Sequence, residues 1–581
     1  MKTIASKNGF SVRAISGTRA VILAMNSEEN NLKNFLGFGI GRKSSDRIYW
    51  LKGFKCFKDL VPDPSAGQRF STTEHPVQDF RWGHYYAEPD TEYTYVVRPL
   101  FKPESNDFSN LRRGTDIEIK IRTESETTGK NSVLFNRGAI VSQAYADNFD
   151  DDIPSDQLEL ILNDPENPRT KWLSRGLLEG ILGFIGQATD SSYSLHCCFY
   201  EISYSPVITA LVEAGKRGAK VEISYEAGHY QISGNVRKET KYGISNKDAI
   251  TPYLNSKNMH FKERIHHVAI PHNKFIILCK NNRPVEVWTG STNISSSGFL
   301  GQSNTGHIVR DVNVAGLFFE YFNMVAKDSL RKDLRAFCET KTPNPGDTLP
   351  EGTTVIFSPR RGTSMLDWYG SKAFNAKSSL IFTSAFGVSP GLSKYFDNQK
   401  EYLRYILMEQ KSRGIGVQDI LEKDPNTRIV LGQGLGTRGS MGNWRRLPGW
   451  NLENWMRREV HFRTKGYVFF VHTKYMAIDV MDNNPTVFTG SANFSPNSLH
   501  SNDENMLLIQ GDSAVSDVYT VEFFRLQTHF YFRQVANRMS ESGTNDPEIR
   551  FLDPTDSWVK KHFTKGNYRY LRREMMGAPV T

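Results

Sequence analysis

The pattern of hydrophobic and polar positions changes once along this chain of 581 residues. Up to about residue 125, short runs rich in β-branched and aromatic residues are separated by clusters of glycine, asparagine, aspartate and proline. The clearest runs are 11–15, 47–50, 91–97 and 116–121. Short strands separated by turn residues predict an antiparallel β-sandwich over residues 1–125.

After about residue 170, helical and strand patterns alternate. Helical periods occur at 172–186, 207–217 and 402–411, and strand-like runs at 193–202, 220–225, 353–357, 379–386 and 427–431. This alternation predicts sheets covered by helices. The predicted fold class is α/β, or α+β overall. It consists of the sandwich, a connector at 126–170, two α/β repeats at 171–345 and 346–545, each a mixed sheet flanked by helices, and a docked or frayed C-terminal tail at 546–581.

An internal repeat gives the strongest functional signal. One copy contains His272-Asn273-Lys274 and then Gly290-Ser291-Thr292-Asn293. The other contains His472-Thr473-Lys474 and then Gly490-Ser491-Ala492-Asn493. In both copies the Gly-Ser-x-Asn group begins 18 residues after the histidine. Equal spacing predicts two equivalent half-sites.

The residue types in each copy suit chemistry at phosphorus. Alternate residues of a strand point to the same face, so His-x-Lys places an imidazole beside an ammonium group. The Gly-Ser-x-Asn group adds a small turn and an amide. Two such halves, related by a pseudo-twofold axis, would face two histidines across one phosphate. One histidine would form a phosphohistidine and the other would act as acid and base. The lysines and asparagines would hold the phosphate oxygens, so we expect neither a metal nor a cofactor.

These motifs resemble those of the phospholipase D superfamily, His-x-Lys-x4-Asp followed by Gly-Ser-x-Asn, and the nearest likeness is to bacterial two-repeat phospholipase D-like proteins over about residues 130–560. The resemblance implies a phosphodiester hydrolase with catalytic residues His272, Lys274, Asn293, His472, Lys474, Asn493 and Glu504. It implies supporting roles for Ser291, Ser491, Asp479, Asn304 and His307. By analogy His272 is the nucleophile and His472 the general acid and base, although the reverse assignment stays open.

The two copies differ in their support. The second has the motif aspartate, Asp479, and an acidic residue, Glu504, so we expect His472 to be the better oriented imidazole. In the first copy Cys279 and Asn304 stand at the corresponding positions, which leaves His272 without an obvious carboxylate. Asn304 and His307 are candidates for a first-repeat hydrogen-bond partner. The tyrosyl-DNA phosphodiesterase branch also lacks the motif aspartate, so the loss does not imply inactivity. A catalytically weak phosphate-binding protein is the rival interpretation.

Composition narrows the setting but not the substrate. The chain is 38% hydrophobic with a net charge of +9, and it has neither a long apolar run nor an apolar N-terminal segment. We therefore expect a cytoplasmic protein without signal peptide or transmembrane segment. The five cysteines fit neither a disulfide framework nor a zinc site.

The positive charge suits a polyanion, so nucleic acid is the preferred partner and substrate, and a phospholipid membrane surface is the alternative. The stretch 89–97 resembles a fibronectin type III or immunoglobulin-like module, and the sandwich is a candidate for binding a protein partner. Basic residues interleaved with tryptophans at 444–465 suit a nucleic-acid groove, a lipid interface or a solvated helix face. The glycine-rich run 434–439 reads as a loop near the site rather than a dinucleotide fingerprint.

Overall fold

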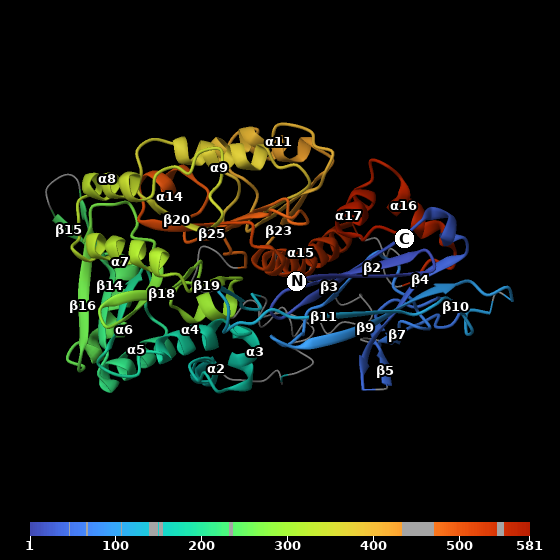
Figure 1. The fold of residues 1–581 in the computed structure, drawn as a ribbon, viewed down its shortest axis with the longest axis horizontal. Coiled ribbons are helices and arrows are strands. Elements are labelled where there is room, and N and C mark those ends of the chain that lie inside the picture. Colours follow the sequence, from blue (N-terminus) through green and yellow to red (C-terminus); the bar gives the residue numbers. More distant parts are fainter. Residues whose placement is uncertain are drawn as a thin grey trace.

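In this computed structural model, the residues described are 1–580 apart from 46, 66–67, 106, 139–148, 150–154, 232–235, 433–469 and 543–550. The N-terminal residues form a pair of antiparallel sheets at one end of the molecule (Figure 1). Two larger mixed sheets follow along the chain and lie together at the other end. The basic–aromatic segment 444–465 and the glycine-rich run 434–439 lie outside the described residues.

The two N-terminal sheets share one apolar core. The first has the strand order β1 (Lys2–Lys7), β2 (Phe10–Ser16), β3 (Val21–Ser27), β8 (Arg81–His84). The second has the order β10 (Arg112–Arg113), β9 (Glu92–Phe101), β4 (Phe35–Ser44), β5 (Arg47–Trp50), with β11 (Ile117–Arg122) also paired to β9. A small additional pair consists of β6 (Lys52–Gly53) and β7 (Phe70–Ser71). In β11, buried isoleucines alternate with exposed charged residues, as expected of a strand covered on one face. The predicted antiparallel sandwich is confirmed.

The first mixed sheet is built around the first motif. Its order is β12 (Asn131–Phe135), β19 (Thr305–Val309), β18 (Arg283–Gly290), β17 (Lys274–Lys280), β13 (Tyr193–Phe199), β14 (Lys220–Gln231), β15 (Val236–Lys238), with β16 (Met259–His266) also paired to β14. Helices α4 (Leu177–Gly186) and α5 (Ser205–Arg217) pack on one face and α7 (Val312–Ala326) on the other. The face covered by α4 and α5 has an apolar core of its own, and the face covered by α7 shares its core with the second repeat.

The second mixed sheet repeats this topology around the second motif. Its order is β20 (Gly352–Ser358), β26 (Glu504–Gln510), β25 (Thr486–Gly490), β24 (Tyr475–Ile478), β21 (Leu380–Ser384), β22 (Arg404–Met408), β23 (Thr427–Leu431). Without β15, the order of the first sheet matches this one strand for strand. Helices α9 (Ser364–Phe374) and α11 (Val417–Lys423) cover the outer face. The inner face shares its core with α7 and with the long helix α15 (Ser513–Ser542). Two mixed sheets flanked by helices are as predicted.

The prediction of a helix at 402–411 is wrong, because this segment contains strand β22. All five of its residues are buried, and it pairs in parallel with a neighbour on each side. A central parallel strand covered on both faces loses the alternation that identifies strands in sequence. Arg404 suggested the polar face of a helix, but its guanidinium is buried in an ion pair 2.7 Å from Asp424.

The helical pattern at 172–186 is divided between α3 (Pro168–Ser174) and α4. The break falls at Arg175 and Gly176, which both have positive φ. Arg175 is buried because its guanidinium bonds Glu522 of α15 at 2.8 Å and the backbone oxygen of Arg19 at 2.7 Å. Helix α15 therefore joins the first repeat to the N-terminal sandwich through one buried carboxylate. No helix among the described residues is long and apolar enough to cross a bilayer.

The C-terminal tail is docked and not frayed over its described residues. Its helices α16 (Lys560–Phe563) and α17 (Tyr568–Met576) follow a short turn of helix at Asp556–Val559. The Trp558 ring lies 5.7 Å from that of Phe35, and Ser11 donates a hydrogen bond to the backbone oxygen of Ala578 at 3.0 Å. The tail thus completes the core of the N-terminal sandwich, and Figure 1 shows the C-terminus beside the strands of that sandwich.

Candidate active site

The two motifs meet at the boundary between the repeats, here called the seam. At the seam, backbone groups of each repeat hydrogen-bond backbone groups of the other. The His272 amide donates to the oxygen of Asp503, and the Asp503 amide donates back to Ile270, both at 3.0 Å. The His472 amide donates to the oxygen of Ser303 at 3.1 Å, and Ser303 donates to Phe470 at 2.6 Å. Each motif histidine therefore lies beside the start of the last strand of the opposite repeat.

This exchange decides the partners of the imidazoles. His272 Nδ1 lies 2.8 Å from the Glu504 carboxylate, and His472 Nδ1 lies 2.8 Å from the Asn304 amide oxygen. The prediction that Glu504 supports His472 is wrong, as is the prediction that His272 lacks a carboxylate. Glu504 and Asn304 each stand 32 residues after the histidine of their own repeat, which marks them as equivalent positions. Spacing cannot indicate that each serves the other repeat's histidine.

The motif serines orient these partners. Ser491 donates to Glu504 at 2.7 Å, and Ser291 donates to the Asn304 oxygen at 2.8 Å. The Asn304 amide nitrogen donates to the backbone oxygen of Gly298 at 2.8 Å, so its oxygen must accept from His472. Both imidazoles then carry their proton on Nδ1 when neutral, which leaves Nε2 with the lone pair.

The motif glycines are required by close backbone contacts. A Cβ atom at Gly290 would lie 2.1 Å from the backbone oxygen of Thr305, and one at Gly490 would lie 2.2 Å from that of Asn505. Gly290 also has a φ of +147°, which side chains rarely adopt. These glycines let the strand that carries Ser-x-Asn approach the strand that carries the acidic or amide partner.

Both motif lysines are buried, and each donates to the backbone oxygen of its own histidine, at 2.5 Å for Lys274 and 2.8 Å for Lys474. Burial lowers the pKa of Lys274 to about 7, although Glu504 and Glu201 oppose the shift. Burial and repulsion from Lys274 lower the pKa of Lys474 well below its usual range. Burial also lowers the pKa values of both imidazoles and raises that of Glu504 to about 7. The site holds more basic groups than nearby carboxylates, so an anion between the repeats would stabilise it.

The two motif asparagines complete the site. The amide oxygen of each, Asn293 and Asn493, is buried without a hydrogen-bond partner. A buried acceptor in this state costs about 1–3 kcal/mol, which a ligand that donates a hydrogen bond could recover. The histidines and lysines of the two motifs interact electrostatically across the seam, so the two motifs share one centre.

Two site residues were missed by sequence reasoning. Tyr200 follows β13, and its ring lies 5.1 Å from that of His272 and 5.2 Å from Lys274 Nζ. The next residue, Glu201, hydrogen-bonds the side chains of Ser295 and Asn293, and burial raises its pKa. The sequence could have indicated them only by their position, because both come directly after β13, the strand that pairs with the His-x-Lys strand.

Two predicted supporting residues, Asp479 and His307, lie away from the imidazoles, as does Cys279, the counterpart of Asp479. Asp479 is at the opposite end of β24 from His472, where it accepts backbone hydrogen bonds from 377–379. Cys279 is the corresponding buried residue of β17. His307 is buried in β19 and bonds Tyr519 at 3.1 Å and Asn131 at 3.0 Å. Replacement of the motif aspartate by Cys279 therefore leaves the catalytic centre itself unchanged.

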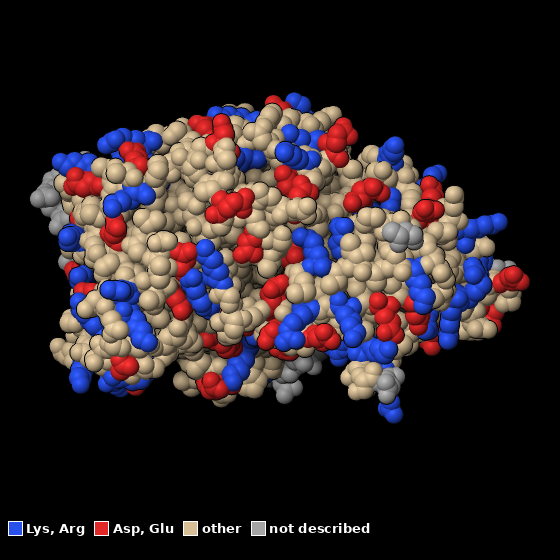
Figure 2. All heavy atoms as spheres, in the orientation of Figure 1, with Lys and Arg blue, Asp and Glu red and all other residues tan. Residues whose placement is uncertain are grey.

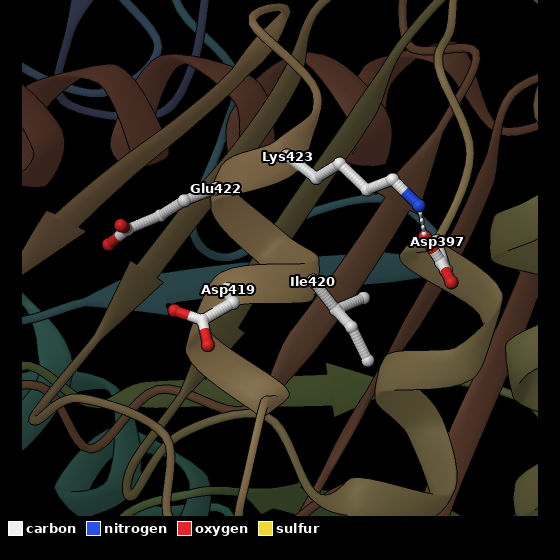
Figure 3. A pocket seen from close by; sticks show the side chains of 5 residues that line it. All are labelled: Asp397, Asp419, Ile420, Glu422 and Lys423. Carbon is white, nitrogen blue, oxygen red and sulfur yellow. Dashed lines mark hydrogen bonds and ion pairs between the residues drawn. The ribbon is translucent and has the colours of Figure 1, made fainter.

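A shallow pocket elsewhere contains none of the motif residues. It lies on α11 and is lined by Asp397, Asp419, Ile420, Glu422 and Lys423 (Figure 3). Lys423 Nζ is already paired with Asp397 at 2.6 Å, as the dashed line in Figure 3 shows. Its acidic side chains would repel a phosphate, whereas the seam between the repeats holds the two buried motif lysines.

Comparison with protein families agrees with this two-repeat site. The family profile described as "Cardiolipin synthase, PLD-like domain" matches residues 181–326 and, separately, residues 389–527. Each matched segment contains one complete motif. The chain belongs to the phospholipase D-like superfamily, with two PLD-like domains and a phosphodiesterase-like fold. Comparison with curated proteins returned no match.

Solved structures similar to this chain come from proteins of different activity. Polyphosphate kinase from Porphyromonas gingivalis is 10% identical, with 85% of this chain and 72% of that chain covered and a TM-score of 0.37. Phosphatidylserine synthase from Haemophilus influenzae is 11% identical, with 65% and 94% covered and a TM-score of 0.38. Nuc from Salmonella typhimurium, a phospholipase D family member, is 22% identical, with 26% and 87% covered and a TM-score of 0.20. None of these likenesses identifies a substrate.

Proposed function

We propose that this protein is a phosphodiester hydrolase that works through a covalent phosphohistidine on His272 and acts on nucleic acid. The observation that carries the proposal is the convergence of two imidazoles at the seam, each with its Nδ1 bound to a side chain of the opposite repeat. In the first step, His272 Nε2 attacks phosphorus and the bond to the leaving oxygen breaks. The His472 imidazolium gives its Nε2 proton to that oxygen, and an alcohol departs.

In the second step water attacks the phosphohistidine. His472 Nε2 takes a proton from the water, the phosphorus–nitrogen bond breaks, and His272 leaves as a neutral ring. His472 ends protonated, as it began, so the cycle is balanced. Lys274 and Lys474 neutralise the non-bridging oxygens as charge builds on them. Because both lysines are buried beside the reacting atoms, they supply the positive charge without a metal ion.

The difference between the two partners supports these roles. A histidine that attacks phosphorus becomes a cation, and the Glu504 carboxylate next to His272 offsets that charge. A histidine that must release a proton works better without such a counter-charge. His472 faces a neutral amide, Asn304, and the nearby Lys474 and Lys274 lower its pKa further. The asymmetry therefore favours His272 as nucleophile and His472 as acid and base.

The substrate preference has weaker support than the chemistry. The net charge of +9 suits a polyanion. On the face in Figure 2, however, basic and acidic side chains are intermixed over both the sandwich and the repeats. The proposal of nucleic acid is therefore made on the net charge of the whole chain.

A substrate panel tests the proposal. Wild-type protein and H272A are incubated with single- and double-stranded DNA and RNA and with phosphatidylcholine liposomes. Each reaction is run with and without an added alcohol, which can replace water as the acceptor of the phosphoryl group. The proposal expects cleavage of a nucleic acid by the wild type alone, with water as the main acceptor. Release of choline without nucleic acid cleavage would instead indicate a phospholipase. Exclusive transfer to the alcohol would indicate a transferase, and inactivity on all substrates would favour a phosphate-binding protein.

A further inference from the structure

The two halves of the catalytic centre have different rims, and the strand registers define which residues correspond. In the first repeat, Phe199 of β13 pairs with Lys274. In the second, Thr383 of β21 pairs with Tyr475, so the next residue, Ser384, stands opposite Lys474. Ser384 therefore corresponds to Phe199. The parallel neighbours agree, because Phe199 pairs with Tyr225 before Glu226, and Ser384 with Met408 before Glu409.

This correspondence matches Tyr200 with Ala385 and Glu201 with Phe386. In the first repeat, Tyr200 and Glu201 are tied to the motif side chains, as described above. In the second repeat, Ala385 is buried and offers no ring to His472, while the Phe386 side chain is 45% exposed. The residues that follow β13 thus carry a phenol and a carboxylate, and the corresponding residues that follow β21 carry an exposed apolar ring.

Two hydrogen bonds of Glu409 place the end of β21 close to the residue before His472. The Glu409 amide donates to the backbone oxygen of Ser384 at 3.1 Å. The Glu409 carboxylate accepts from the amide of Val471, the residue before His472, at 2.7 Å. One residue therefore connects the end of β21 to the catalytic histidine.

The turn that presents Phe386 is held by side-chain hydrogen bonds. The Ser384 hydroxyl donates to the backbone oxygen of Gly387 at 2.9 Å and accepts from its amide at 3.2 Å. The Val388 amide donates to the Ser412 hydroxyl at 3.0 Å. A turn fixed on both sides of Phe386 displays the ring without the entropic cost of ordering it on binding.

We propose that Phe386 forms a base-stacking subsite on the His472 side of the centre, where it binds the nucleobase of the departing nucleoside. This inference rests on the proposed nuclease function. His472 gives its proton to the leaving oxygen, so the departing nucleoside lies on its side of the phosphate. Among the described residues of this turn, Ala385 and Val388 are buried and Phe386 is the exposed ring. A single ring suits stacking on a planar base better than it suits an acyl chain, which needs a continuous apolar surface.

The test compares F386A, F386W and F374A with wild type on dinucleotide substrates. Phe374 is a matched control, because its side chain is 43% exposed and it precedes the opposite end of β21. One substrate has both bases, and two others each lack one base. We expect F386A to lower kcat/KM about 5- to 150-fold on the complete substrate, the range that stacking on one base gives. F386W should stay near wild type, and F374A should have no effect.

Removing the base of the departing nucleoside should lower wild-type kcat/KM by a similar factor and abolish the effect of F386A. Thermal unfolding of each variant checks that it is folded. If wild type cleaves the dinucleotides and F386A matches it, or if F386A is equally impaired on both abasic substrates, the subsite is overturned while the nuclease function stands. If wild type cleaves no nucleic acid, the function and the subsite both fail.

Discussion

Replacing Glu504 by glutamine tests whether the negative charge of this side chain, and not only its shape, supports the proposed nucleophile His272. The carboxylate is fully buried, 2.8 Å from His272 Nδ1 and 2.7 Å from the Ser491 hydroxyl, and it accepts from Asn502 at 3.1 Å. Glutamine has the same length and can still accept through its amide oxygen. E504Q therefore removes the negative charge that offsets the developing cation on His272 and retains most of the geometry.

The size of the effect follows from this geometry. Two unit charges about 4 Å apart interact by about 4 kcal/mol at an effective dielectric constant of about 20. With the ring charge about half formed in the transition state, the loss is about 2 kcal/mol, or about 30-fold in the rate of phosphohistidine formation. We expect kcat/KM for a p-nitrophenyl phosphodiester to fall by this factor in E504Q.

The pH profile gives a second readout. Because burial raises the pKa of Glu504 to about 7, a reaction that needs its carboxylate becomes faster as pH rises through about 7. Because the pKa of Lys274 is lowered to about 7, a reaction that needs its ammonium form becomes slower above that pH. The wild-type profile is then a narrow bell whose limbs belong to the coupled site as a whole. E504Q should lose the rising limb, and its falling limb should move to lower pH because Glu504 no longer raises the pKa of Lys274.

D479N is the matched control, since it neutralises the aspartate of the second His-x-Lys-x4-Asp motif, which lies away from the imidazoles. Asp479 accepts backbone hydrogen bonds from 377–379, and asparagine can still accept them through its oxygen. We expect its rate and pH profile to match wild type. The reasoning is refuted if E504Q retains the wild-type rate with an unchanged rising limb, or if D479N is impaired as strongly as E504Q.

Three further predictions concern the neighbours of this pair. N304D places a carboxylate on His472 and raises a pKa that burial holds well below its usual range, so more of the imidazole is protonated near neutral pH and departure of alkoxide leaving groups should become about 3- to 10-fold faster while departure of p-nitrophenol is unchanged; an equal change for both leaving groups would contradict the acid role. R264M removes the guanidinium bound 2.8 Å from buried Asp503 and should lower the free energy of unfolding by about 3–5 kcal/mol, measured in urea; an unchanged unfolding midpoint would show that this pair does not hold the seam. Inorganic phosphate at 100 times its Kd should stabilise wild type by about 2.7 kcal/mol in thermal unfolding, and K474M should reduce that gain; equal stabilisation would place phosphate elsewhere.

Much of the fold and the motif residues could be predicted from the sequence, because local patterns report local structure. The alternation in β11 and the amphipathic period of α5 with its Gly218 stop are examples. The strand β22 was misread because a strand buried on both faces has no alternation, and Arg404 finds its counter-charge only in the folded state. An ion pair between segments that are distant in sequence does not change the hydrophobic periodicity of either segment, so it cannot be predicted from that periodicity.

The same limit explains what was missed at the site. Equal spacing identified Glu504 and Asn304 as equivalent, but their exchange between repeats arises from the backbone pairing of Asp503 and Ser303 across the seam. Tyr200 was unmarked because its role comes from strand register and not from a motif. Sequence could name the reacting groups, whereas the assignment of one partner to one histidine required the packing of two repeats.

The most direct test of the two-repeat mechanism is to trap the intermediate. A p-nitrophenyl phosphodiester labelled with ³²P is mixed with wild type, H272A and H472A, and the protein is quenched and analysed for acid-labile, base-stable label. Because p-nitrophenolate leaves without a proton, the account predicts that H472A accumulates phosphohistidine on His272, since no base activates water. It predicts no label on H272A. Label that persists in H272A, or that maps to His472, would contradict the account.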